Sequence, residues 1–146
     1  MVAACATPET PAPLVGVSAE ARVLIDSLIV DEARAADRYA RVVSRFGVVA
    51  PFAELGQASQ RRLEALHGVV VRGGWSAPDP FAGLIGVEVY ADVAGACDVA
   101  ARFSRRTIER YERLLTRALP PEVRAVVRDN RDAVSGTDLE RTTACR

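Results

Sequence analysis

The chain has 146 residues, and its nineteen acidic and nineteen basic side chains leave no net charge at pH 7. This length predicts one compact domain with a real core. The charge balance excludes the electrostatic field that gathers nucleic acid, so no nucleic-acid partner is expected. Apolar residues make up 49% of the chain and aromatic residues only 5%, which favours an all-α domain over a β sandwich or barrel.

Residues 1–17 are rich in proline and threonine and show little periodicity, so we expect a flexible leader ahead of a bundle at 18–146. Residues 2–5, VAAC, match the pattern that ends at the lipidated cysteine of bacterial lipoproteins. The charged and apolar segments of a signal peptide are missing. Two alternatives stay open: Cys5 is the lipidation site and membrane tether of a longer, exported chain, or the match is a coincidence and the protein is cytoplasmic.

The first helix is predicted from Ser18 to about Phe46, because the Ser18 hydroxyl can accept hydrogen bonds from the free amides of the first turn. Its apolar stripe keeps helical spacing except for one gap of seven residues, between Leu28 and Ala35. Glu32 fills that gap. The pattern therefore predicts a carboxylate on the core face of this helix.

The second helix is predicted from Phe52 to about Arg72, after a short connection at residues 47–51. Its stripe alternates steps of three and four, which is typical of the seam of a helix bundle. Two central positions of the seam are polar, Ser59 and Arg62. We therefore expect charge in the core of this helix as well.

A connection at residues 73–86, dense in glycine and proline, is long enough to cross a whole bundle. The second and third helices can therefore run parallel. The third helix is predicted from about Val87 to Leu119, and the fourth from Pro121 to about Thr143. Four helices with two short links and one long crossover predict a four-helix bundle of the ferritin-like kind.

Three segments resemble the ferritin-like superfamily, including rubrerythrins and poorly characterised bacterial families: DEARAADRY at 31–39, FAELGQASQRRLEAL at 52–66 and ERYERLLTRALPPEVRAVV at 109–127. In that superfamily two irons are held by one Glu from each of two helices and a Glu-x-x-His from each of the other two. The carboxylates bridge the metals and the imidazoles cap them. The resemblance thus implies where ligands would lie in this chain.

At the implied positions of the first two helices, only one ligand is kept. Glu32 is the first-helix glutamate, whereas Ser59 stands at the glutamate position and Arg62 at the histidine position of the second helix. A guanidinium stays protonated and brings positive charge beside two cations. We therefore expect that the di-iron site is lost and that no cofactor is bound.

On the third and fourth helices the implied ligand positions fall on Ser104, Ser135 and Asp138. A buried arginine left alone costs several kcal/mol, so Arg62 needs at least one carboxylate. The sequence therefore predicts a polar core, with Arg62 between two carboxylates and serine hydroxyls around it, made of Glu32, Ser59, Arg62, Ser104, Ser135 and Asp138.

The alternative is a divergent metal site that binds iron or manganese and carries out oxidase or peroxidase chemistry, with candidate ligands Glu32, Glu64, His67 and Asp98. Glu64 and His67 form a second Glu-x-x-His, but it lies five residues beyond the expected one. Five residues rotate a helix by about 140°, which turns the pair away from the seam. No catalytic residue is assigned, since no cysteine has a histidine at a suitable spacing and no phosphate loop is present.

Cysteine spacing allows one disulfide. If the third and fourth helices form a hairpin folded at Pro120, Cys97 faces roughly position 143, close to Cys145. The alternative is two free thiols. Taken together, the sequence favours a ferritin-like bundle that acts as a non-catalytic binding or structural module, with homo-oligomerisation through apolar helix faces as a further alternative and partners otherwise unknown.

Overall fold

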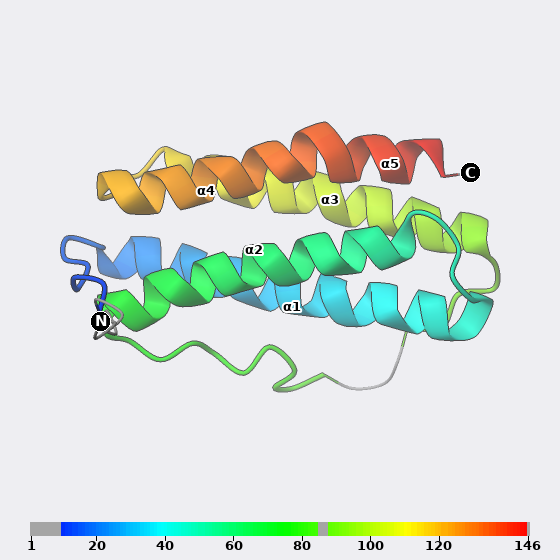
Figure 1. Ribbon diagram of the computed structural model, residues 1–146, viewed down its shortest axis with the longest axis horizontal. Coiled ribbons are helices and arrows are strands. Elements are labelled where there is room, and N and C mark those ends of the chain that lie inside the picture. The colour runs from blue at the N-terminus through cyan, green and yellow to red at the C-terminus, as the bar shows by residue number, and fades with distance from the viewer. Residues whose placement is uncertain (1–9, 85–87, 146) are drawn as a thin grey trace, which may run out of the picture.

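The structure is a computed structural model that describes residues 10–84 and 88–145. These residues form only helices and connections: α1 (Ala19–Phe46), α2 (Phe52–Gly73), α3 (Val93–Leu115), α4 (Pro121–Ala133), the π-helical turn η1 (Val134–Asp138) and α5 (Leu139–Ala144). The last three follow one another directly and act as one long fourth helix (Figure 1). The predicted all-α four-helix architecture is therefore confirmed. Among the described helices, none is long and apolar enough to cross a membrane.

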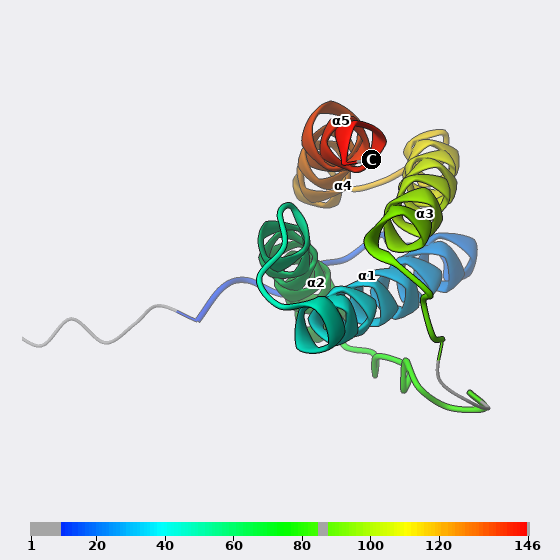
Figure 2. The same ribbon diagram turned by 90° about the vertical axis from the view of Figure 1, so that its right-hand side faces the viewer.

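The four helices lie side by side around a common core (Figure 2). Short links at 47–51 and 116–120 make α1 antiparallel to α2, and α3 antiparallel to the fourth helix. A long crossover, whose described residues are 74–84 and 88–92, leads from α2 to α3 along the outside of the bundle, beside α1. Because this crossover returns along the bundle, α2 and α3 run in the same direction, as the length of the connection allows.

The start of α1 agrees with its capping signal, since the Ser18 hydroxyl accepts a hydrogen bond from the Ala21 amide at 3.1 Å. The end of the predicted leader, however, lies on the bundle. The Leu14 amide donates to the Arg72 carbonyl at 2.8 Å, and Val17 is only 7% exposed. Leu14 and Val17 of the predicted leader thus pack on the bundle, and Cys5 lies outside the described residues.

The predicted third helix is longer than the observed one, α3. It stops at Leu115 rather than Leu119, because the Thr116 hydroxyl donates to the Arg113 carbonyl at 2.7 Å and closes the last turn. At the other end the helix begins at Val93, where the Asp92 carboxylate caps the first turn. Val87 itself lies outside the described residues, but residues 88–92 are described and are not helical, so the predicted start near Val87 is wrong by about one and a half turns.

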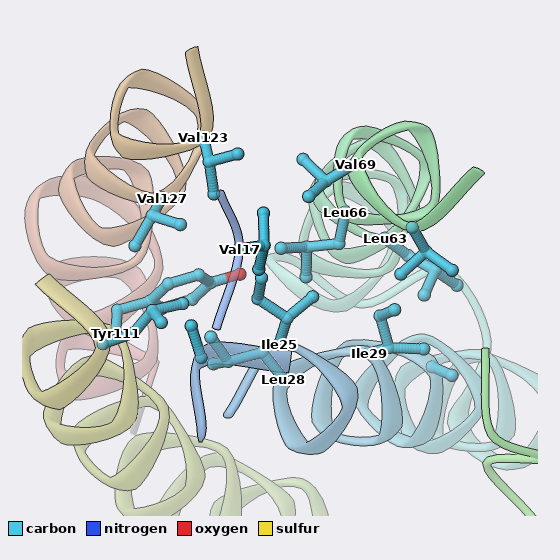
Figure 3. Packing of buried hydrophobic residues seen from close by; sticks show 14 of the residues in the cluster. Val17, Ile25, Leu28, Ile29, Leu63, Leu66, Val69, Tyr111, Val123 and Val127 are labelled. Atoms are coloured by element: carbon cyan, nitrogen blue, oxygen red, sulfur yellow. The ribbon is translucent and has the colours of Figure 1, made fainter. Parts of the chain in front are cut away.

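Two apolar clusters fill the core, one in each half of the bundle. The first lies between the start of α1, the ends of α2 and α3, and α4, and Figure 3 shows its side chains meeting, with the Tyr111 hydroxyl directed into their midst. The second lies at the other end; its most buried members include Tyr39, Phe52, Leu55 and Ala100. Each fully buried large apolar side chain contributes about 1.5–3 kcal/mol. Between the clusters the helices carry polar side chains.

Candidate functional site

Arg62 lies in the middle of the bundle with 5% of its surface exposed, and it binds carboxylates from two other helices. Its Nε donates to Glu32 Oε1 of α1 at 2.8 Å. Its Nη2 donates to Asp138 Oδ2 of η1 at 2.6 Å and to the Ser59 hydroxyl, one turn back on α2, at 3.2 Å. The structure thus brings together four of the predicted polar-core residues.

The third helix reaches this group through Tyr111 rather than through a serine. The Tyr111 hydroxyl donates to Glu32 Oε1 at 2.8 Å. Ser104 is buried on α3, as predicted, at 2% exposure. Asn130 of α4 donates from Nδ2 to the Tyr111 hydroxyl oxygen and to the Arg62 carbonyl, both at 3.3 Å. All four helices therefore contribute to one hydrogen-bonded network.

Sequence reasoning missed Asn130, although the signal was present. Asn130 interrupts the seven-residue gap between Val127 and Val134 in the apolar stripe of the fourth helix, just as Glu32 does on α1. A polar residue in such a gap lies on the core face, so it needs a hydrogen-bond partner there. Tyr111 has the spacing of the apolar stripe of α3, which indicates the core face but says nothing of the partner of its hydroxyl.

The inclusion of Ser135 in the polar core is wrong. Ser135 is exposed, and its hydroxyl donates to the Asp132 carbonyl at 3.4 Å. The buried residues of this segment are Val134 and Asp138, both in η1. Since Ser135 directly follows Val134 in this wider turn, it lies off the buried stripe that Val134 and Asp138 form.

Burial and charge act against each other in this network. Burial raises the pKa of the Glu32 carboxyl, and Arg62 and the Tyr111 hydroxyl oppose this shift without cancelling it. Burial likewise raises the pKa of Asp138 against the effect of Arg62. For Arg62, burial acts to lower the pKa, but the two carboxylates outweigh it and the pKa is raised. Two carboxylates thus share one guanidinium. Both carboxyl groups bind a proton more tightly in this core than the same groups do in water.

One carboxylate oxygen adds to this imbalance. Glu32 is fully buried, and its Oε2 has no hydrogen-bond partner among the described residues. A buried anionic oxygen without a donor is costly, whereas a protonated carboxyl loses less by burial. The free oxygen therefore agrees with the raised pKa of Glu32.

The four candidate ligands of the alternative metal site do not converge. Glu64 and His67 are exposed on α2 and Asp98 is exposed on α3, whereas Glu32 is fully buried. Within residues 10–84 and 88–145, no group of three or more His, Cys, Asp or Glu side chains is placed to hold a metal ion. The four candidate ligands therefore do not surround one metal position.

Of the two cysteine alternatives, the structure has the disulfide. Cys97 and Cys145 are bonded, with their Cα atoms 5.9 Å apart, which is an ordinary separation. Cys97 is fully buried near the start of α3, and Cys145 directly follows α5. The bond therefore ties the last turn of the fourth helix to α3.

Comparison of this chain with protein-family models, with curated proteins and with solved structures finds no match. The class of protein rests on the fold and the site alone: an all-α four-helix bundle with a buried network centred on Arg62.

Proposed function

We propose that this chain is a ferritin-like four-helix bundle in which a buried ion-pair network takes the place of the di-iron centre, and that it acts as a non-catalytic binding or structural module. One observation carries the proposal. Arg62 stands where the ferritin-like pattern has a metal-binding histidine, and it donates to both Glu32 and Asp138.

The residues present do not fit a di-iron centre. A guanidinium has no lone pair to offer a metal and keeps its positive charge at all ordinary pH values. Here it also lies within 2.8 Å of the carboxylate oxygens that a metal would need. An iron ion at this place would have to displace Arg62 from both carboxylates and leave a buried guanidinium without these ion pairs. The network therefore supports a structural role for these side chains.

A location outside the cytoplasm is part of the proposal. Structural disulfides are typical of oxidising compartments and rare in the reducing cytoplasm. The Cys97–Cys145 bond supports this location, and the VAAC pattern at residues 2–5 agrees with it. Lipidation of Cys5 stays a prediction.

Metal analysis tests the proposal. The protein is produced in medium supplied with iron and manganese, and the metal bound per chain is measured after purification, alongside Glu32→Ala as a matched control. We expect far less than one metal ion per chain in both proteins. Near-stoichiometric metal in the natural chain that Glu32→Ala removes would contradict the proposal and favour the oxidase or peroxidase alternative.

A further inference from the structure

Four arginines follow one another along one side of the second half of α1. They are spaced by four, three and four residues, which aligns them on one face of a helix: Arg34, Arg38, Arg41 and Arg45. The crossover from α2 to α3 passes along α1, on the side of the bundle away from the fourth helix (Figure 2). The first two arginines of this row contact the crossover.

Oxygen atoms of the crossover already bind the first two arginines. Arg34 Nε donates to the Pro80 carbonyl at 2.7 Å. Arg38 Nε donates to Glu88 Oε2 at 2.7 Å, and the same oxygen accepts from the Tyr90 hydroxyl at 2.8 Å. Each of these guanidiniums thus has an oxygen acceptor supplied by the chain, and the Glu88 carboxylate is engaged by two donors.

Beside the last two arginines there is a pocket, and Arg41 takes its acceptor, Asp37, from α1 itself rather than from the crossover. Its volume is about 350 Å³, within the range of roughly 300–1,000 Å³ typical of small-molecule sites. Its lining comes from the end of α1 and the end of the crossover: Arg41, Ser44, Arg45, Glu88, Val89 and Tyr90. The lining combines two arginines and Ser44 with Val89 and Tyr90. It also includes Glu88, whose carboxylate already accepts hydrogen bonds from Arg38 and from the Tyr90 hydroxyl.

The existing contacts of the two guanidiniums are weak ones. Arg41 pairs with Asp37 at 2.7 Å, but both side chains are largely exposed, and such pairs contribute little. The Arg45 guanidinium carbon lies 5.3 Å from the centre of the Phe46 ring, a cation–π contact that supplies no oxygen acceptor to its N–H groups. Both groups can therefore donate into the pocket.

We propose that this pocket binds a small organic anion. Its oxyanion group, a carboxylate or a phosphate, accepts hydrogen bonds from Arg41, Arg45 and the Ser44 hydroxyl, and its short apolar or aromatic body lies against Val89 and Tyr90. The anion's oxygens thus accept hydrogen bonds from Arg41 and Arg45, just as oxygens of the crossover accept them from Arg34 and Arg38. The pocket gives the proposed binding module a ligand site and rests on that proposal, although it does not involve the core network.

Titration with three probes tests the proposal: inorganic phosphate, phenyl phosphate and benzoate, followed by calorimetry on the full chain. We expect at least one aromatic anion to bind more tightly than inorganic phosphate, because it also covers the apolar wall. The tighter of phenyl phosphate and benzoate identifies the oxyanion. Arg41→Ala and Arg45→Ala should each weaken binding by about tenfold or more, as expected for loss of a charged hydrogen bond.

Arg128→Ala is the matched control, because Arg128 is an exposed arginine of α4, across the bundle from the crossover. It should leave the affinity unchanged, and the unfolding transitions of all three variants should match that of the natural chain. The proposal is overturned if no probe saturates, if inorganic phosphate binds as tightly as the aromatic anions, or if Arg128→Ala weakens binding as much as Arg41→Ala. Each of these results is independent of the metal content that tests the proposed function.

Discussion

Arg62 is shared by two carboxylates that reach it from different helices, Glu32 and Asp138. The three residues are each 5% exposed or less, so water screens their charges little. Removing one partner of such a buried group costs about 3–5 kcal/mol, whereas an exposed pair such as Arg41 with Asp37 contributes about 0.2–1 kcal/mol. Among the ion pairs of the described chain, those of Arg62 therefore have the largest effect on stability.

The excess of carboxylates predicts an unusual pH dependence of stability. The pKa of Glu32 is near 4.5 in the unfolded chain and higher in the folded chain. Protonation of Glu32 therefore favours folding below about pH 4.5. This contribution to stability is lost as the pH rises through the pKa of the folded chain. The Glu32→Gln variant does not lose stability in this way, because glutamine carries no titrating proton. We expect its unfolding free energy, measured in urea, to increase relative to the natural chain as pH rises above about 4.5.

Asp138 strengthens this expectation, because its charge raises the pKa of Glu32 and this repulsion is mutual, so removal of the Glu32 charge also eases the ionisation of Asp138. Circular dichroism at the lowest pH checks that the variant is folded. A difference between the two proteins that stays constant, or that shrinks with rising pH, would show that Glu32 is not held with a raised pKa.

The fourth helix contains a π turn because its buried stripe is spaced too widely for an α-helix. The stripe is Val127, Asn130, Val134, Asp138 and Thr142, with steps of three, four, four and four. Each step of four overshoots a full turn by about 40°, and three in a row would carry the stripe off the core. The wider η1 turn absorbs this drift and keeps Asp138 directed at Arg62.

Deletion of Gly136 tests this explanation. Gly136 is exposed within η1, and its removal changes the steps to three, four, three and four, which suit a plain α-helix. We expect a change in unfolding free energy within about 1 kcal/mol. Deletion of the exposed Arg128 turns everything after it by about 100° and should cost more than about 3 kcal/mol. Equal losses in urea unfolding would refute the explanation.

Much of this arrangement could be predicted from the sequence, because helix stripes report the core face directly. Glu32 fills a gap in an apolar stripe, and Arg62 lies on a seam, so both had to be buried and paired. Ser135 was misplaced because α-helical spacing was assumed across η1. The bond from Tyr111 to Glu32 could not be predicted, since it depends on how far α3 is shifted along α1, which only packing decides.

The bundle as a whole has a polar layer between two apolar clusters. The first cluster includes Leu28 and Leu66 and the second includes Tyr39 and Phe52, and the Arg62 network lies between them along the helices. An apolar layer tolerates sliding of one helix past another, whereas paired charges allow one alignment only. We infer that the network fixes the register of the four helices, a role attested for buried polar groups in other helix assemblies.

Urea unfolding of Arg62→Met is the most direct test of this account. The change keeps an apolar stem of similar length but leaves Glu32 and Asp138 buried without a cation, so we expect a loss of about 3–5 kcal/mol. Arg61→Met, at the exposed neighbouring position, is the control and should change stability by no more than about 0.5 kcal/mol.

A triple variant, Glu32→Gln with Arg62→Met and Asp138→Asn, removes every charge of the network and should recover most of the loss, which keeps the test informative even if Arg62→Met does not fold. We expect a large loss of stability in the single variant and recovery in the triple variant. An Arg62→Met protein as stable as Arg61→Met would contradict it.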